Sequence, residues 1–446
     1  MATDAQTVVR TTEAAWTARE PAKMIAALQE CDRVLQALPA EQLVGEGEAK
    51  APNPADPLAK ERALLWYWRG RLLVMADKPE AVVQGLHSLD QAIARLRLFA
   101  GDAQMEEALA VAWMSRGSGL FRLQSRDAMA EAVRCYEQAI QALERVPAGV
   151  RDAALGASWM NRGVGLMHLD HVKDTPEQTT ARLTESVQSF ERAIALLEPL
   201  AASQPASLHN LASTWSNLGM VRSRLQDAAG AVEAQRKAVE LFRPLVAKSE
   251  DAGETFELAA RLFNLGQACG AAGDAEGALA AGRESLAVAG SVKTDDPQAL
   301  ELTLRTRHAL CVVLGGQLAA GRAQAGDPQR AGRLEEAGDL VEDGLAELRA
   351  RGAVPEGVMM AGTRLYEFGA WLYRTQQPQF LAEFLLEHLG VDATRAKIAL
   401  AAAQAARQAF AQRSFTETTH GDMERVLEIL QELGQVEARA KELGAA

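Results

Sequence analysis

The feature that most constrains this 446-residue chain is a tryptophan followed four residues later by a glycine, repeated along its first half. The series comprises Trp66 with Gly70, Trp113 with Gly117, Trp159 with Gly163, Trp215 with Gly219 and, with leucine in place of tryptophan, Leu262 with Gly266. Successive glycines are 47, 46, 56 and 47 residues apart. A spacing of four puts both residues on one face of a helix, so the pattern predicts a repeating helical unit.

A second helix in each unit carries a small, a large and a small residue at spacings of four and three. In the clearest unit, Leu208 to Leu241, a turn at 227–230 precedes the triplet. The triplets are Gly85, Leu89, Ala92; Ala132, Tyr136, Ala139; Ser186, Phe190, Ala193; Ala231, Gln235, Ala238; and Ala278, Gly282, Ser285. A glycine inside a helix costs roughly 1 kcal/mol relative to alanine, so its recurrence predicts close packing of the second helix against the first.

These positions resemble the tetratricopeptide repeat, and long bacterial arrays in particular, although the unit is longer than that family's usual ~34 residues. The resemblance implies an all-α, right-handed α-solenoid of helical hairpins. Low aromatic content, 5%, and the lack of alternating β-branched runs agree, and we expect no sheet. We expect a helical pair at 1–38, a linker or long loop at 39–57, a repeat array at 58–390 and a C-terminal helical cap at 391–446.

Composition and missing motifs exclude several classes of function. A net charge of −12 argues against a nucleic-acid binder, and no signal-like start or long apolar run predicts membrane insertion, so we expect a cytoplasmic protein. The four cysteines are scattered, and no common catalytic or phosphate-binding motif is present. His168, Asp170, His171 and Asp174 in the long third unit match no metal-binding spacing. We therefore expect no enzyme activity, no cofactor and no metal site.

Polar residues recur two places before the first-helix glycine. They are Asn161, Asn217 and Asn264, and in an aligned sixth unit, where Leu310 replaces the glycine, His308. The resemblance implies that this place faces the concave groove, where asparagines in related kinesin light chain arrays contact a peptide backbone. An amide offers both a donor and an acceptor to a peptide unit. The alternative is that these asparagines bond to neighbouring helix ends and fix the stacking.

Arginine directly precedes the glycine in the first three units, as Arg69, Arg116 and Arg162. The family pattern places leucine there, as in Leu218 and Leu265. Two interpretations stay open. The arginines either pair with carboxylates of the next repeat, or they make the N-terminal half of the groove basic enough to bind an acidic peptide or a terminal carboxylate.

Aromatic residues concentrate near the C-terminus, where Tyr366, Phe368, Trp371 and Tyr373 form a candidate docking patch or, alternatively, the core of a last hairpin with Gly369 in the glycine place. The functional prediction is a non-catalytic scaffold or adaptor that binds a protein or peptide in the groove. Two alternatives stay open: a structural subunit of a larger enzyme complex that docks through this aromatic part, and a sensor of a peptide or small ligand.

Overall fold

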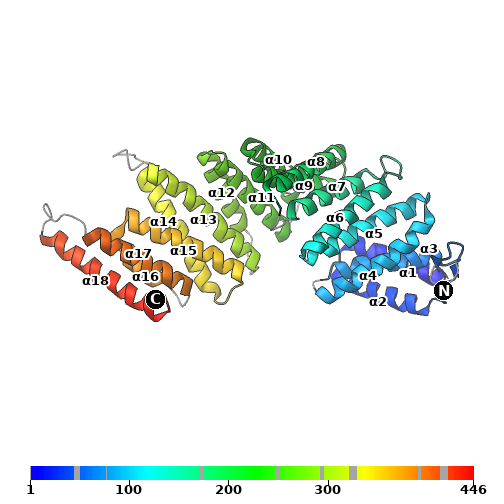
Figure 1. Cartoon of the computed structure of the whole chain (residues 1–446), viewed down its shortest axis with the longest axis horizontal. Helices are drawn as coiled ribbons and strands as arrows, with labels where there is room; N and C mark the ends of the chain where they lie inside the picture. The colour runs from blue at the N-terminus through cyan, green and yellow to red at the C-terminus, as the bar shows by residue number, and fades with distance from the viewer. Residues whose placement is uncertain are drawn as a thin grey trace. The chain divides into compact units, whose positions relative to one another are not determined.

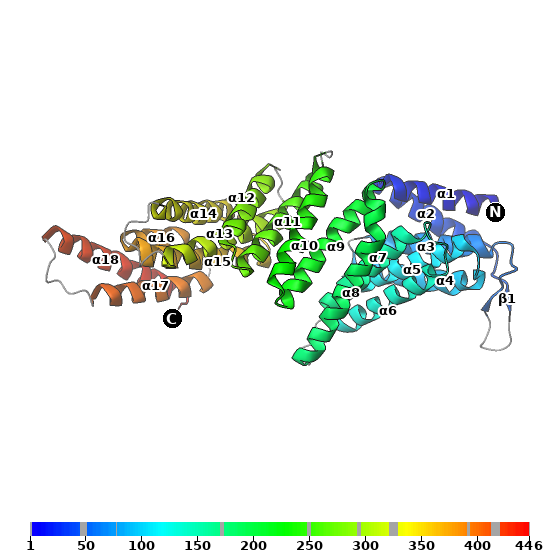
Figure 2. The same cartoon turned by 90° about the horizontal axis from the view of Figure 1, so that it is seen from above.

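The computed structural model describes residues 2–44, 51–76, 78–169, 174–247, 251–291, 296–320, 329–389, 393–411 and 420–445, and most of these are helical. The chain divides into two compact units, Met1–Phe242 and Arg243–Ala446. Within each unit, successive helices lie side by side as antiparallel pairs (Figures 1 and 2). The all-α fold expected from the sequence is therefore confirmed.

The first unit holds the clearest repeats. Its elements are α1 (Ala2–Ala18), α2 (Pro21–Ala37), β1 (Leu43–Val44), β2 (Ala51–Pro52), α3 (Ala59–Val74), α4 (Pro79–Leu96), the 3-10 helix η2 (Arg97–Phe99), α5 (Ala103–Arg122), α6 (Arg126–Leu143), α7 (Asp152–His168), α8 (Pro176–Ala201), α9 (Pro205–Arg224) and most of α10 (Ala228–Val246). The long third unit in the sequence corresponds to an extended second helix, α8, of 26 residues.

The second unit continues the pairing of helices. Its elements are α11 (Ala252–Ala271), α12 (Ala275–Gly290), α13 (Pro297–Ala320), α14 (Arg330–Arg351), α15 (Glu356–Gln376), the 3-10 helix η4 (Pro378–Phe380), α16 (Leu381–His388), α17 (Ala393–Ala411) and α18 (His420–Glu442). Buried side chains of α13 to α18 form one continuous hydrophobic core. None of the helices in the described part of the chain combines the length and apolar character needed to cross a membrane.

Local sequence fixes where the helices begin. At the start of α5 the carboxylate of Asp102 accepts hydrogen bonds from the backbone N–H groups of Gln104 and Met105, at 3.1 and 3.3 Å. Thr175 and Gln178 form a reciprocal capping box at the start of α8. These contacts satisfy amide groups that have no partner inside the helix, and so they fix where α5 and α8 begin.

The packing of glycine against a large residue, predicted from the sequence, is confirmed. A Cβ atom added to Gly163 of α7 would lie 2.6 Å from Cε1 of Phe190 on α8, and Phe190 is fully buried. The same relation holds in other hairpins, for Gly70 with Leu89, Gly117 with Tyr136 and Gly219 with Gln235. Glycine therefore lets the two helices of a hairpin approach as closely as the tetratricopeptide-like pattern requires.

The segment between α2 and α3 corrects one expectation. The sequence predicted no sheet, but β1 and β2 pair in antiparallel register, with Leu43 opposite Pro52. Two residues per strand are too few to leave an alternating pattern in the sequence. The described parts of this segment are tethered to the array, because Glu41 accepts hydrogen bonds from Arg95 at 2.6 and 2.9 Å.

Candidate functional site

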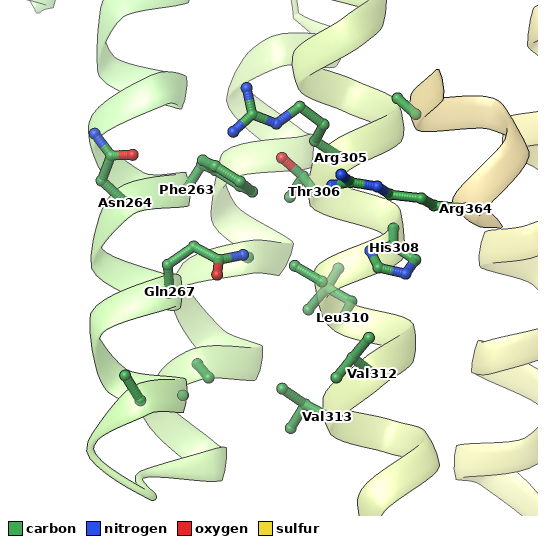
Figure 3. Close-up of a pocket in the computed structure, with 17 residues that line it drawn as sticks. Phe263, Asn264, Gln267, Arg305, Thr306, His308, Leu310, Val312, Val313 and Arg364 are labelled. Atoms are coloured by element: carbon green, nitrogen blue, oxygen red, sulfur yellow. The ribbon is translucent and has the colours of Figure 1, made fainter. Parts of the chain in front are cut away.

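A cavity with a volume of about 620 Å³ lies in the second unit. Most of its lining comes from α11, α13 and α15, the first helices of their hairpins, and Ala278 and Gly282 of α12 complete it. Figure 3 shows Gln267 of α11 extending toward α13, which carries Arg305 and His308, while Arg364 extends toward α13 from α15. Asn264 lies one helical turn before Gln267 on α11. The size suits a short segment of an extended ligand.

The cavity lies where the packing rule of the repeat is broken. In the α11–α12 hairpin, Gly282 stands at the place where the other second helices carry a leucine, an aromatic residue or a glutamine. The opposite wall is also small, with Gly266 and Gly270 on α11. Leu310 of α13 fills part of the space, and its Cδ2 atom lies 2.6 Å from where a Gly282 Cβ would be. The rest of the missing side-chain volume is open.

The recurring polar residues are divided between the two units. Asn161 lies on α7 and Asn217 on α9 of the first unit, and Asn264 and His308 both line the cavity of the second. All four side chains are half-buried. Within the described residues, no hydrogen bond engages the amide groups of Asn161, Asn217 or Asn264. The alternative in which these asparagines bond to neighbouring helix ends therefore has no support from the structure.

His308 is electrostatically perturbed by its place in the cavity wall. Burial is the main cause that lowers the pKa of its imidazole, and the positive charge of Arg364 lowers it further, while Glu367 acts in the opposite direction. The ring is therefore neutral near pH 7, with one nitrogen able to donate a hydrogen bond and the other able to accept one. This complements the amide groups across the cavity.

The three arginines that precede the first-helix glycines are already paired with acids. Each carboxylate lies on the second helix of the preceding hairpin and accepts a hydrogen bond from the arginine's Nε atom. Arg69 donates to Asp32, Arg116 donates to Asp90 at 2.7 Å, and Arg162 donates to Glu137 at 3.1 Å. The sequence interpretation placed the acid in the next repeat, and this direction was wrong. The arginine side chains are only 17–18% exposed, so burial makes such pairing necessary.

Each of these arginines also contacts its own hairpin. Their Nη1 atoms donate to the second helix, where the acceptors are Ser88 for Arg69, Glu131 and Cys135 for Arg116, and Ser189 for Arg162. The guanidinium carbons lie 5.8, 5.9 and 5.9 Å from the rings of Trp66, Trp113 and Trp159. The arginines thus bridge three helices each, which favours the structural interpretation over a basic groove.

The aromatic residues near the C-terminus lie mostly in the core. Tyr366 is fully buried and donates a hydrogen bond to the carbonyl oxygen of Leu385 at 3.1 Å, so it is not available to a partner. Phe368, Trp371 and Tyr373 are half-buried and pack against the same core. The prediction of Tyr366 as part of a docking patch was therefore wrong, because its side chain is buried in the core between α15 and α16.

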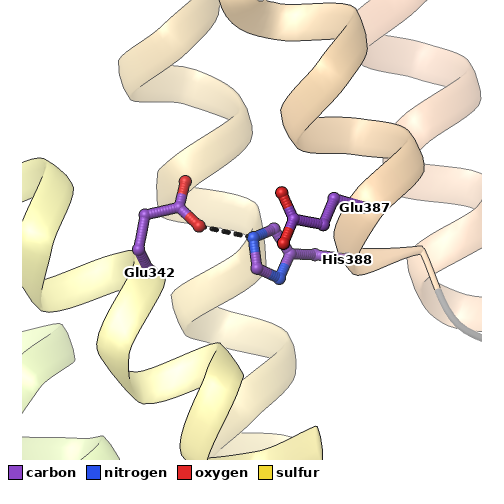
Figure 4. A group of neighbouring side chains, drawn as sticks. All are labelled: Glu342, Glu387 and His388. Atoms are coloured by element: carbon purple, nitrogen blue, oxygen red, sulfur yellow. Dashed lines mark hydrogen bonds and ion pairs between the residues drawn. The ribbon is translucent and has the colours of Figure 1, made fainter.

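One cluster of metal-binding residue types was not anticipated from the sequence. Glu342, Glu387 and His388 offer atoms within 4.8 Å of one another (Figure 4). Nε2 of His388 pairs with Glu342, whose other oxygen accepts a hydrogen bond from Tyr373 at 2.8 Å. Arg349 donates to Glu387 at 3.1 Å. Protein donors thus already occupy both carboxylates. Of the four polar residues noted in the long third unit, Asp170 and His171 lie outside the described residues.

The cavity residues that sequence reasoning missed include Gln267, Arg305 and Arg364. Gln267 follows Asn264 by three places, and Arg305 precedes His308 by three. A helical turn therefore joins each of them to a predicted residue, and extending the polar positions by one turn would have identified both. Arg364 precedes Gly369 by five places, as Arg305 precedes Leu310, so the shared place in the repeat could have identified it once Arg305 was recognised.

The fold and the packing of its hairpins define this chain as a helical-repeat protein of the tetratricopeptide-like type. No family model matches the chain, and no curated protein matches it. Similar solved structures include BtubC from P. vanneervenii, with 16% identity, a TM-score of 0.45 and coverage of 62% of this chain and 94% of that one. These likenesses are weak, so the assignment depends on the chain's own hairpins.

Two further solved structures resemble the chain over nearly its whole length. A Rap protein complexed with Competence and Sporulation Factor is 14% identical, with a TM-score of 0.43 and coverage of 99% of this chain and 98% of that one. The apo form of the quorum sensor NprR from B. thuringiensis is 12% identical, with a TM-score of 0.44 and the same coverage.

Proposed function

We propose that this protein is a non-catalytic scaffold or adaptor that binds an extended peptide or protein segment along the first helices of its hairpins. The single observation that carries this proposal is the cavity between α11, α13 and α15, which Asn264 and His308 both line. Side chains that both donate and accept hydrogen bonds can hold a peptide backbone without reading its sequence.

Asn161 and Asn217 offer the same chemistry in the first unit. They occupy the same place relative to the first-helix glycine as Asn264 does, and their amides are likewise not engaged by the described residues. A half-buried amide without a protein partner is a ready site for a ligand's peptide group, because burial strengthens the hydrogen bond that a ligand makes there.

The alternative of a structural subunit that docks through its aromatic C-terminal part has less support. Tyr366 is buried, and Tyr373 uses its hydroxyl on Glu342. A sensor of a peptide or small ligand would use the same cavity as the scaffold. It differs from the scaffold in its output rather than in its site.

The test is affinity capture from a lysate of the source cells, with the intact protein and the triple variant Asn161→Ala, Asn217→Ala, Asn264→Ala as baits. We expect partners captured by the intact protein to be lost by the triple variant. The matched control is Gln431→Ala with Gln435→Ala, because both side chains are exposed on α18, which contributes no residue to the cavity lining. Equal capture by all three baits would contradict the proposal. Circular dichroism checks that each variant is folded.

A further inference from the structure

The cavity between α11, α13 and α15 carries a local excess of positive charge. Two arginines, Arg305 and Arg364, line it, and none of the described residues in its lining is acidic. The chain as a whole has a net charge of −12, so the positive charge of this lining is opposite in sign to the net charge of the protein. A cation-lined, partly enclosed site attracts an anion more strongly than the same charges on an open surface, because its walls exclude water.

Arg364 is the more available of the two cations. It projects from α15 and is exposed, and within the described residues no hydrogen bond or ion pair engages its guanidinium group. In Figure 3 it extends toward α13 and ends beside Thr306 and His308. This differs from Arg69, Arg116 and Arg162, whose charges are matched by carboxylates.

Arg305 is only weakly engaged. Its nearest acid, Glu301, lies 3.7 Å from Nη1, beyond hydrogen-bond distance, and the side chain is 52% exposed. Its guanidinium carbon lies 5.2 Å from the ring centroid of Phe263, a contact that holds the group at the mouth of the cavity. A guanidinium positioned in this way keeps its N–H groups free for a planar, two-oxygen acceptor.

We propose that Arg305 and Arg364 bind a carboxylate of the ligand, so that the cavity recognises an acidic peptide. The carboxylate belongs either to the peptide's C-terminus or to an aspartate or glutamate side chain. Asn264 and Gln267 on α11 then hold the adjoining backbone, and Val312, which is 53% exposed, offers an apolar contact for a neighbouring side chain. This inference depends on the proposed function, since it specifies the ligand of the same surface.

The experiment uses four pools of random N-acetylated hexapeptides dialysed against the full-length protein, with the retained peptides quantified by mass spectrometry. One pool has free C-termini and no acidic residue, one is amidated with a fixed central aspartate, one is amidated with a fixed central glutamate, and one is amidated and has no acidic residue. We expect at least one carboxylate-bearing pool to be retained about tenfold more than the neutral amidated pool. Which pool is retained identifies the source of the carboxylate.

Single variants then test the two arginines. Arg364→Ala and Arg305→Ala should each reduce retention of the preferred pool about tenfold, the usual effect of losing a charge-assisted hydrogen bond. Arg374→Ala is the matched control, because it is exposed on the same helix as Arg364 but does not line the cavity, and it should leave retention unchanged. All three arginines are exposed, so these changes leave the core intact.

The outcomes separate this inference from the proposed function. If the neutral amidated pool is retained as well as the others, and Asn264→Ala abolishes its retention, the carboxylate site is overturned while the peptide-binding function stands. If Arg305→Ala and Arg364→Ala leave retention of an acidic pool unchanged, the assignment of these residues is overturned. If the intact protein retains no pool at all, both the carboxylate site and peptide binding at this cavity are overturned.

Discussion

Replacing Gly369 of α15 with alanine tests how tightly the last hairpin is packed. The added Cβ would meet the ring of Phe384 and lie 2.8 Å from Cγ1 of Val341. Phe384 is 3% exposed and stacks on Tyr366 with ring centroids 5.4 Å apart, so it has little room to move. Overpacking costs about 1–3 kcal/mol, and alanine regains about 1 kcal/mol of helix propensity. Because the ring cannot move aside, the cost lies toward the upper end of this range, and we expect the free energy of unfolding to fall by about 1–2 kcal/mol.

The matched control is Gly434→Ala in the same unit. Gly434 lies inside α18, and among the described residues no atom outside its own helix lies within 4 Å of the place that its Cβ would take, so alanine should raise the free energy of unfolding by up to about 1 kcal/mol. Both variants are measured by urea unfolding, followed by far-ultraviolet circular dichroism. Val341→Ala combined with Gly369→Ala should cost less than the sum of the single changes, because it frees space at the contact. A Gly369→Ala variant as stable as the wild type would refute the reasoning.

Two further predictions concern charged groups. Arg162→Met should lower the free energy of unfolding by about 1–2 kcal/mol, more than Glu137→Gln, because Arg162 also bonds to Ser189 and its guanidinium carbon lies 5.9 Å from the Trp159 ring. Urea unfolding followed by tryptophan fluorescence measures both variants, and equal losses would contradict the bridge between three helices. Burial and Arg364 lower the pKa of His308 from 6.5, so below that pH the unfolded chain binds a proton that the folded chain does not. Stability should therefore fall as pH drops from 7 to 5, and His308→Gln should reduce that fall in urea unfolding at each pH.

Much of the fold could be predicted from the sequence because steric constraints repeat. Gly117 must lie opposite Tyr136 for the two helices of the hairpin to pack closely. This requirement fixes the number of residues between the glycine and the large residue in every unit that packs in this way. The pairing of β1 with β2 could not be foreseen, since two residues carry no periodicity. The direction of the arginine pairing was also hidden. Asp32 and Asp90 precede their arginines by different numbers of residues, so no single spacing marks them.

The candidate site was only partly predictable, because it forms where the repeat departs from its own rule. Asn264 and His308 were predicted from their place in the repeat. The open volume beside them comes from Gly282, which takes the place of the large residue in the second helix, and from the sequence alone it only makes this unit a weaker match to the repeat. Arg364 reaches the cavity from a helix 100 residues after Asn264. Its approach depends on how α15 packs on α13, which local periodicity does not encode.

The arginine bridges make each early hairpin depend on the one before it. In a linear repeat, stability is the sum of a term for each repeat and a term for each junction, and here every junction from α2 to α7 contains an arginine that pairs with a carboxylate of the preceding hairpin. A shortened chain that begins at α3 would leave Arg69 without Asp32 and with its charge uncompensated. Loss of the preceding hairpin would therefore affect Arg69 most, because Arg116 and Arg162 also pair with Glu131 and Glu185 of their own hairpins.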